Sequence, residues 1–593
     1  MRQPLRLWPG AAAAAVLFVT GWIVPFVLPG WAEISQMVAV ASSAVIVVWW
    51  LFFSRARWVE RLGALAAMAV AVLITRPFLD PSIAGGAMGG LGYVLSVPMM
   101  ALGLVAWAVG TRRLPDRARL AVLPAALVLS CAMTALLRTD GIGGGKLFDL
   151  QWRWTPTAEE RLLADVKDDP IAPPALPVAP AAAAPAAASP ADTPAAVPAP
   201  ATARPARVPA WPGFRGPERN SVVRGVRIDS NWSASPPLEL WRRPIGPGWS
   251  SFAVDGDLLY TQEQRGDDEL VACYRVSTGQ PVWRHRDAVR FYESNAGAGP
   301  RGTPTLDNGR VYALGATGVL NALDARTGAV LWSRDAAADT KMEVPMWGIS
   351  SSPLVIGDIV IVATGGTLAG YDAATGTPRW VGPAHDFSYS SPHLVTIDGV
   401  AQVLLLSSPG AISVSPVDGA LLWEHTWETG AIVQPSVTAD GDILISNMAM
   451  AGGVGVRRLK ATRGSDGWTV QEKWTSNGLK PYFNDYVVHH GHAFGFDGSI
   501  LSSIDLTDGT RKWKGGRYGA GQMILLADQD LLLVLAEEGG LALVSATPDK
   551  FTEVARAAAI EGKTWNHPVL VDDVLLVRNG EEMAAFRLAL ADR

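Results

Sequence analysis

The fold is decided by a repeated stretch whose clearest copy reads Leu323-Asp-Ala-Arg-Thr-Gly328-Ala-Val-Leu-Trp332. Each copy has the end of a strand, a short turn that closes on glycine, and a tryptophan four residues after that glycine. The other copies are Tyr274-Arg-Val-Ser-Thr-Gly279-Gln-Pro-Val-Trp283, Tyr371-Asp-Ala-Ala-Thr-Gly376-Thr-Pro-Arg-Trp380, Val414-Ser-Pro-Val-Asp-Gly419-Ala-Leu-Leu-Trp423 and Ile504-Asp-Leu-Thr-Asp-Gly509-Thr-Arg-Lys-Trp513. Copies at a regular interval indicate a repeat architecture.

The residue types of the repeat predict its conformation. The glycine permits the positive φ of a tight corner between two strands. The Asp, Ser or Thr ahead of it can hydrogen-bond the backbone of the turn. The tryptophan is large and flat enough to wedge between neighbouring units. The repeat therefore predicts antiparallel hairpins that stack through their tryptophans.

Degenerate copies complete the series. They lie at residues 459–474 and 543–554, and an unfinished strand covers residues 583–588. The spacing of about 40–49 residues suits four short strands, which make one propeller blade. We therefore predict an all-β, eight-bladed β-propeller over residues 211–593.

The eighth unit lacks its fourth strand. The fourth-strand pattern appears instead at Leu238-Glu-Leu-Trp241-Arg-Arg243, ahead of the first blade. We predict that these two fragments pair, which would close the ring and remove the open sheet edges of the blade array.

The first 150 residues predict a membrane domain. Hydrophobic residues make up 49 % of the chain, charged residues 18 %, and the mean hydropathy is +0.19, which is too apolar for a soluble protein of this size. Five apolar runs approach the ~20 residues of a spanning helix, at residues 8–28, 34–53, 62–75, 88–110 and 120–137. The third run is the shortest and spans only if flanking arginines snorkel. The prediction is an all-α domain of about five transmembrane helices over residues 1–150, embedded in a lipid bilayer.

The basic residues predict its orientation. Nine arginines fall in the N-terminal tail and in the loops after the second and fourth runs, against two arginines and one lysine in the other loops. Cytoplasmic loops carry the excess of Lys and Arg. The propeller is therefore expected in the periplasm of a bacterium, tied to the inner membrane by a multi-pass anchor. A cleaved signal peptide is disfavoured, because the first run is long and further runs follow it.

Two short regions connect the predicted domains. Within residues 151–169, Thr157-Ala-Glu-Glu160 has the spacing of a capping box ahead of a short juxtamembrane helix at residues 161–166. Residues 170–210 are almost wholly Pro and Ala, a composition typical of a semi-rigid spacer. We expect this linker to separate the anchor from the propeller.

Charge and cysteine content exclude several classes of function. Residues 1–150 hold 12 Lys and Arg against 6 Asp and Glu, whereas the remainder holds 38 against 49. Such an acidic propeller does not suit a nucleic-acid partner. Cys131 and Cys273 alone cannot form a disulfide framework or a Cys-rich metal site. No ionisable residue lies in the middle of an apolar run, so the helices predict an anchor rather than an ion pathway.

The repeats resemble those of a known family. Their form, A/L-x-D-x-x-T-G-x-x-x-W, is similar to the PQQ-type (pyrrolo-quinoline quinone) tryptophan-docking repeats of quinoprotein dehydrogenases and of the outer-membrane assembly lipoprotein BamB. Five spans ahead of such a propeller also resemble the membrane-bound glucose dehydrogenases. The segment Trp211-Pro-Gly-Phe-Arg-Gly-Pro217 resembles that of membrane-anchored PQQ-like propeller proteins. The repeat is structural in all of them, so the resemblance implies the fold more strongly than the function.

Candidate site residues come from the segments that lead into the innermost strands, because these segments converge on one mouth of the propeller. Small residues and prolines dominate these segments because eight strands crowd together there. The polar groups at a propeller centre often only pack against one another and hydrogen-bond to water. The larger or more polar residues of these segments suit a concave ligand site. The ligand-binding candidates are Arg301, Trp347, Ser351, Tyr389, Gln434, Asn484, Asp485, Gln522, Trp565 and Asn566. For Arg301, the glycines around it allow close approach to an anionic or carbonyl oxygen of a ligand. The alternative is a structural pair with Asp485 across the channel.

The resemblance also implies an enzymatic alternative. A quinoprotein dehydrogenase would hold PQQ with Ca²⁺ on hard oxygen ligands, with a carboxylate base, a cation near the quinone oxygens and a planar sandwich. Asp485, Asn484, Arg301 and Trp347 or Trp565 could fill these roles. The sequence has no vicinal cysteine pair and no CxxCH haem motif.

Two further motifs predict turns. Val487-Val-His489-His490-Gly-His492 suggests a metal site, yet His490-Gly491 replaces the Asp-Gly of residues 255–256 and 440–441. We therefore predict a two-residue hairpin turn and assign no metal. Arg265-Gly-Asp267 falls in another predicted hairpin turn.

Together these patterns predict a membrane-anchored periplasmic propeller that acts as a binding or scaffold module. Its expected partner is an envelope protein or a small ligand at the propeller mouth, and no catalytic residue or cofactor is assigned. The alternative is a PQQ-dependent alcohol or sugar dehydrogenase that passes electrons to membrane quinone.

Overall fold

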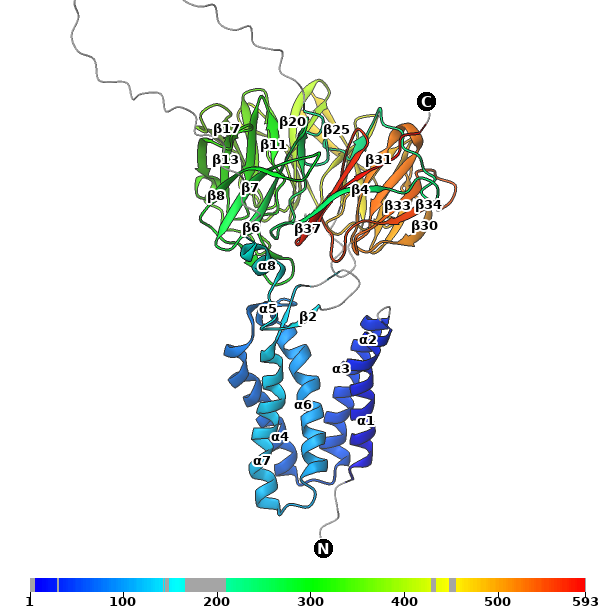
Figure 1. Cartoon of the computed structure of the whole chain (residues 1–593). Helices are drawn as coiled ribbons and strands as arrows, with labels where there is room; N and C mark the ends of the chain where they lie inside the picture. The colour runs from blue at the N-terminus through cyan, green and yellow to red at the C-terminus, as the bar shows by residue number, and fades with distance from the viewer. Residues whose placement is uncertain are drawn as a thin grey trace, which may run out of the picture.

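The computed structural model describes residues 6–28, 31–141, 143, 149–165, 209–427, 433–446 and 455–591. A bundle of helices lies at one end of the molecule and a ring of small sheets at the other (Figure 1). Residues 170–208 of the expected linker lie outside the described residues.

The N-terminal region contains the four to five apolar helices that the sequence predicts. Four helices are long and apolar enough to cross a membrane, Ile34–Phe53, Trp58–Phe78, Leu91–Gly110 and Arg117–Leu136, and the apolar helix Trp8–Ile23 is shorter. The α-helical elements are α1 (Trp8–Phe18), α2 (Val24–Val27), α3 (Ala32–Val48), α4 (Trp58–Thr75), α5 (Pro81–Gly85), α6 (Leu91–Gly110) and α7 (Asp116–Ala132). These helices suggest a membrane anchor.

The third apolar helix is longer than the run that predicted it. Helix α4 begins at Trp58, and a 3₁₀ turn continues it to Phe78. Arg61, near its start, donates to the carbonyl of Ala56 at 2.7 Å and to that of Leu51. Because the guanidinium of this arginine has hydrogen-bond acceptors at the helix end, the helix can extend beyond its apolar stretch.

A small β-hairpin and a short helix lead from the bundle toward the propeller. Strands β1 (Leu137–Thr139) and β2 (Leu150–Trp152) pair antiparallel. Helix α8 (Ala158–Ala164) follows, and the predicted capping box is present at its start. The helix starts three residues earlier than predicted because Thr157 is its N-cap, and it ends at Ala164; Val166 lies outside the described residues.

The C-terminal domain is the predicted eight-bladed propeller, and each blade is an antiparallel four-stranded sheet. Blades 1 to 4 are β5–β8 (Ala253–Asp255, Leu258–Arg265, Asp268–Arg275, Pro281–Asp287), β11–β14 (Thr305–Asp307, Arg310–Leu314, Val319–Asp324, Val330–Asp335), β15–β18 (Leu354–Ile356, Ile359–Thr364, Thr367–Asp372, Pro378–Val381) and β19–β22 (His393–Ile397, Val400–Ser407, Gly410–Val414, Leu421–Thr426). Blades 5 to 7 are β23–β26 (Ser436–Val437, Ile443–Ser446, Val456–Gly464, Gly467–Ser476), β27–β30 (Val487–His489, His492–Asp497, Ile500–Asp505, Arg511–Arg517) and β31–β34 (Gln522–Leu526, Leu531–Leu535, Gly540–Ser545, Glu553–Ala558). Blade 8 is β35–β37 (Val569–Val571, Val574–Arg578, Glu582–Arg587) with β4 (Leu238–Pro244).

The repeat tryptophans dock each blade onto the next. The indole of Trp283 in blade 1 donates to the carbonyl of Ala325 at 3.0 Å, beside the blade 2 turn that closes on Gly328. That glycine has φ of 73°, and a Cβ there would lie only 2.5 Å from the Trp283 ring. Asp324 accepts the backbone N–H of Thr327 at 2.9 Å, which holds the turn. The glycine is therefore required both by the corner and by the neighbouring tryptophan.

The ring closes as predicted. Strand β4 pairs antiparallel with β37 to complete blade 8. Trp241 of β4 donates to the carbonyl of Val276 at 2.7 Å and covers the turn glycine Gly279 of blade 1. Strand β4, which lies ahead of blade 1 in the chain, thus completes the last blade and docks it on the first.

Minor elements complete the propeller. The segment ahead of β4 adds β3 (Val222–Val223), which pairs parallel with β31 at the inner edge of blade 7. Strands β9 (Tyr292–Glu293) and β10 (Gly297–Ala298) form a hairpin between blades 1 and 2, and α9 (Ala336–Thr340) follows blade 2.

Candidate functional site

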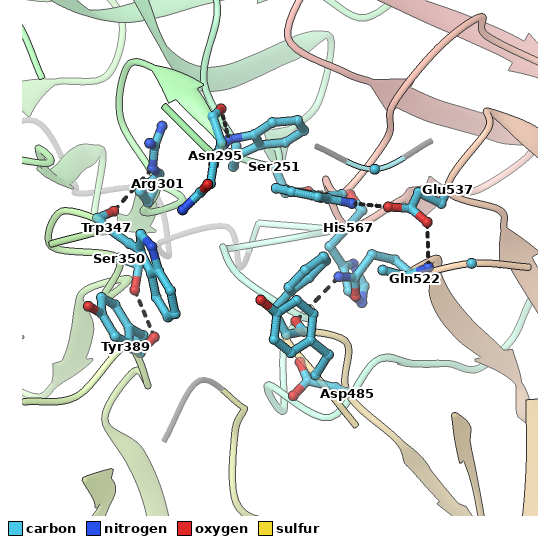
Figure 2. A pocket seen from close by; sticks show the side chains of 18 of the residues that line it. Ser251, Asn295, Arg301, Trp347, Ser350, Tyr389, Asp485, Gln522, Glu537 and His567 are labelled. Carbon is cyan, nitrogen blue, oxygen red and sulfur yellow. Dashed lines mark hydrogen bonds between the residues drawn. The ribbon is translucent and has the colours of Figure 1, made fainter. Parts of the chain in front are cut away.

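The lead-in segments of all eight blades converge on one pocket of about 740 Å³. Figure 2 shows part of its lining. This volume lies within the range of small-molecule sites. The structure therefore places a ligand-sized cavity at the propeller centre, where the sequence predicted one.

Seven of the ten predicted site residues line this pocket: Arg301, Trp347, Tyr389, Gln434, Asp485, Gln522 and Trp565. The other three do not. Ser351 accepts the backbone N–H of Ala363 at 3.1 Å, Asn484 accepts that of Tyr482 at 3.0 Å, and Asn566 donates to the carbonyl of Ser250 at 2.7 Å. Side chains alternate along an extended chain, so Ser350 and Ser352 face the cavity and Ser351 does not. That the seven bind a ligand stays a prediction.

Aromatic rings form two opposite walls of the pocket. On one side the centroid of Trp565 lies 4.7 Å from that of Trp249 and 4.5 Å from that of Phe483. On the other side Trp347 and Tyr389 are 5.1 Å apart. Figure 2 shows Trp347 and Tyr389 across the cavity from Gln522 and Glu537. These walls suit a flat or apolar ligand.

A lysine lies over the larger aromatic wall. The ammonium of Lys563 is 4.5 Å from the ring centre of Trp565 and 5.2 Å from that of Trp249. It donates to the carbonyl of Asn295 at 3.3 Å. Burial lowers the pKa of Lys563 to about 8. The lysine was not among the predicted site residues, because it lies outside the repeat and outside the segments that were expected to converge.

The motif at residues 211–217 supplies part of the pocket wall. Phe214 lines the pocket, and the guanidinium of Arg215 lies beside it in the propeller centre. Arg215 Nε is 3.4 Å from Asp485 Oδ2 and donates to Ser221 Oγ at 2.8 Å. Another Arg215 N–H donates to the carbonyl of Tyr486 at 3.1 Å. The resemblance carried by this motif did not indicate its place in the pocket wall.

The expected alternative pair between Arg301 and Asp485 is wrong, because each residue has another partner. Asp485 pairs with Arg215 and accepts the backbone N–H of Gln434 at 3.0 Å. Arg301 donates to the carbonyls of Gly297, Ala298, Gly299 and Trp347 at 2.7–3.3 Å, and its guanidinium is 3.5 Å from Glu293. Arg301 therefore holds the β9–β10 hairpin against the pocket wall.

We expect Arg301→Ala to lower the free energy of unfolding of the propeller by roughly 2–4 kcal/mol, because several buried carbonyls and Glu293 lose a charged donor. Arg301→Lys should restore little, since one ammonium cannot satisfy four divergent carbonyls. Denaturant unfolding followed by near-UV circular dichroism measures both variants. An unchanged midpoint in Arg301→Ala would contradict this role.

The two other pocket carboxylates also have protein partners. Glu537 accepts the indole N–H of Trp565 at 2.8 Å and the backbone N–H of Ala520 at 3.0 Å. Glu293 accepts the backbone N–H groups of Asn295 and Ala296 at 2.8 and 2.6 Å. These carboxylates were missed because Glu293 lies in the short β9–β10 hairpin and Glu537 in a loop, and the repeat pattern marks neither. Their hydrogen bonds fix the shape of the cavity.

The N-terminal helical region contributes to the same pocket. Ala87 and Met88, in the turn between α5 and α6, line it together with Gly143. The backbone N–H of Ala87 donates to Asn295 Oδ1 at 3.2 Å. Farther out, Nη1 and Nη2 of Arg290 each donate to one carboxylate oxygen of Glu159 in α8 at 2.8 Å. The pocket thus opens on the side of the propeller that faces the helical bundle.

Two predicted turns are confirmed. His490 and Gly491, with φ of 45° and 74°, connect β27 to β28. Residues 266–267 connect β6 to β7.

Two buried histidines predict acid sensitivity. Burial lowers the pKa of His567 and of His393 to about 3, and Arg215 adds to both shifts. The unfolded chain protonates each ring near pH 6.5, whereas the folded chain does so near pH 3. Stability should therefore be complete above pH 6.5 and fall as the pH drops toward 3, by about 2 kcal/mol per histidine at pH 5. Urea unfolding at pH 7 and pH 5 measures the loss. A stability equal at both values would contradict the neutral buried state of the two rings.

Comparison with known proteins relates the propeller to two groups. A family model described as outer membrane protein assembly factor BamB matches residues 238–391. BamB of Shewanella oneidensis is 24 % identical over 330 residues, which cover 51 % of this chain and 75 % of that protein. The quinohemoprotein alcohol dehydrogenase ADH-IIG of Pseudomonas putida is 31 % identical over 139 residues, covering 22 % of this chain and 18 % of the enzyme.

Two solved structures also resemble part of the chain. BamB from Moraxella catarrhalis superposes with a TM-score of 0.44 at 16 % identity, covering 60 % of this chain and 99 % of that one. A quinohemoprotein alcohol dehydrogenase from Comamonas testosteroni has a TM-score of 0.44 at 12 % identity, covering 65 % and 81 %. The eight blades and the sequence matches together identify a PQQ-like propeller similar to BamB and to quinohemoprotein dehydrogenases, as the repeats predicted.

Proposed function

We propose that this PQQ-like propeller is held in the periplasm by an inner-membrane anchor and acts as a binding module, with a small apolar or aromatic ligand in its central pocket. The main support for this proposal is that aromatic walls enclose the cavity while its charged side chains already have protein partners. Asp485 is paired with Arg215, Arg301 with backbone carbonyls and Glu537 with Trp565. Groups so engaged fix the shape and polarity of a site and are poorly placed to move protons.

The pocket residues do not fit the cofactor of the enzymatic alternative. Ca²⁺ takes six to eight oxygen ligands, but Asp485 already accepts the N–H of Gln434 and faces Arg215, and Asn484 lies outside the lining. Among the described residues, the one group of three His, Cys, Asp or Glu side chains with converging ligand atoms lies elsewhere. The proposed function therefore includes no step through PQQ or Ca²⁺.

A direct test separates binding from quinone-dependent oxidation. PQQ and Ca²⁺ are added to the purified full-length protein, and a bound-quinone spectrum and dye reduction with alcohols and sugars are measured. We expect neither signal. Turnover with either substrate class would overturn the binding proposal in favour of the dehydrogenase.

The ligand itself can be sought by native mass spectrometry of the protein purified in lipid nanodiscs. We expect a co-purifying small molecule whose occupancy falls at least tenfold in Trp347→Ala, because one aromatic wall is lost. Trp154→Ala is the matched control, since Trp154 is exposed outside the pocket. Equal occupancy in the two variants would contradict the pocket as the site.

An envelope protein partner is the second candidate, favoured by the similarity to BamB. In that case a segment of the partner would enter the pocket. Site-specific crosslinking from Ser350, which lines the cavity, would capture a protein in cells, whereas a small ligand would leave no crosslinked band.

The orientation rests on the positive-inside rule. The arginine-rich loops after α3 and α6 lie at the end of the bundle away from the propeller (Figure 1). A reporter active only in the periplasm should therefore be active after Leu150 and inactive after Arg57. The reverse pattern would place the propeller in the cytoplasm.

A further inference from the structure

A side-chain cluster lies at the seam between blades 6 and 7, away from the pocket. His489 ends β27, His490 begins the turn to β28, and Asp530 follows β31 in the next blade. His489 Nε2 is 2.6 Å from Asp530 Oδ1, and His490 Nε2 is 3.4 Å from the same oxygen. One ligand atom from each of the three residues lies within 4.8 Å of the others.

The turn does not explain this cluster. Asp398-Gly399 and Asn308-Gly309 make the corresponding turns of blades 4 and 2 with similar positive φ, so the corner itself needs no histidine. Two imidazoles are instead aimed at one carboxylate of the neighbouring blade, with ring centres 3.9 Å apart. His489 is 9 % exposed, His490 is 75 % exposed and Asp530 is 52 % exposed. The cluster is thus anchored on one side and open to solvent on the other.

We propose that His489, His490 and Asp530 bind a Zn²⁺ ion that clips blade 6 to blade 7. Zinc is commonly bound by imidazole nitrogens and a carboxylate oxygen in a tetrahedron, with water in the fourth position when three protein ligands are present. The 3.4 Å separation of His490 from Asp530 matches the spacing of two ligands about 2.0–2.1 Å from one tetrahedral ion. Entry of the ion requires His489 and Asp530 to exchange their direct hydrogen bond for two metal bonds.

The ligand set selects the class of ion. Ca²⁺ and Mg²⁺ prefer all-oxygen sites, whereas two imidazoles favour Zn²⁺ and its neighbours in the transition series. The site is separate from the pocket, because the pocket lies at the start of β31, at Gln522, and Asp530 lies past its other end. The proposal is therefore independent of the proposed binding function.

The third histidine of the motif is a built-in control. His492 Nε2 faces Asp505 at 3.7 Å, and its Nδ1 contacts the carbonyl of His490 at 2.8 Å. It belongs to the same local sequence but lies outside the cluster.

The test uses the full-length protein, purified without a polyhistidine tag and stripped with a chelator. Zinc stoichiometry and affinity are measured by equilibrium dialysis with elemental analysis, and the melting temperature is recorded with and without Zn²⁺. We expect one Zn²⁺ per chain, a higher melting temperature with Zn²⁺, and no comparable effect of Ca²⁺. His490→Ala should weaken binding at least tenfold and abolish the thermal shift, and it should fold normally because His490 is exposed.

Asp530→Asn should weaken zinc binding to a similar extent, since the carboxylate oxygen is lost, while His492→Ala should bind as the unaltered chain does. The proposal is overturned if the chain takes up no stoichiometric Zn²⁺. It is equally overturned if His490→Ala and His492→Ala bind Zn²⁺ alike, because the ion would then lie elsewhere.

Discussion

Arg215→Ala is expected to destabilise the propeller more than any other single substitution at its centre. Arg215 is 1 % exposed and Asp485 is 8 % exposed, so removal of the guanidinium leaves a buried carboxylate without its cation, at a cost of roughly 3–5 kcal/mol. Burial already raises the pKa of Asp485, and Arg215 opposes this shift most strongly, ahead of the backbone hydrogen bond from Gln434. The loss is measured as the change in free energy of unfolding in denaturant.

Two further variants make this result specific. Arg224 belongs to the same segment but is exposed, so Arg224→Ala should leave stability nearly unchanged. The double variant Arg215→Met/Asp485→Leu removes both charges and should recover much of the loss, because no uncompensated charge remains. If Arg215→Ala alone melts with the unaltered chain, the ion pair does not organise the propeller centre.

The second large effect is expected from truncation. A chain that begins at residue 244 lacks most of β4, so β37 keeps an open apolar edge and the Trp241 contact with blade 1 is lost. Open edges of this kind promote aggregation. A chain that begins at residue 206 keeps both the ring closure and Arg215, and it should be soluble and folded.

Size-exclusion chromatography and near-UV circular dichroism compare the two truncated chains. A third chain that begins at residue 238 keeps β4 but lacks Arg215 and β3. We expect it to close the ring yet melt earlier, which separates closure from the role of the buried ion pair. Equal solubility and stability of the chains that begin at 206 and 244 would refute the closure model.

The candidate site was predictable only to the level of segments. Every lead-in segment does reach the pocket, because the innermost strands of a closed propeller necessarily converge. Which side chains of a segment point into the cavity was not predictable. Ser350 faces the cavity, whereas the predicted Ser351 faces away. Glu293 comes from the short β9–β10 hairpin, and Glu537 and Lys563 come from loops, and no periodic pattern describes these segments.

The sequence by itself determined the blades, their number, the ring closure and the apolar helices. Each of these rests on local requirements repeated along the chain: positive φ at glycines such as Gly328, a tryptophan at a constant distance, and apolar runs of near-membrane length. Only the tertiary structure decided that Arg215 pairs with Asp485, 270 residues away, and that Asp530 joins the histidine pair of the preceding blade. Such contacts depend on how neighbouring blades align and on which segment enters the channel. Those features arise from packing between distant parts of the chain, which local patterns do not encode.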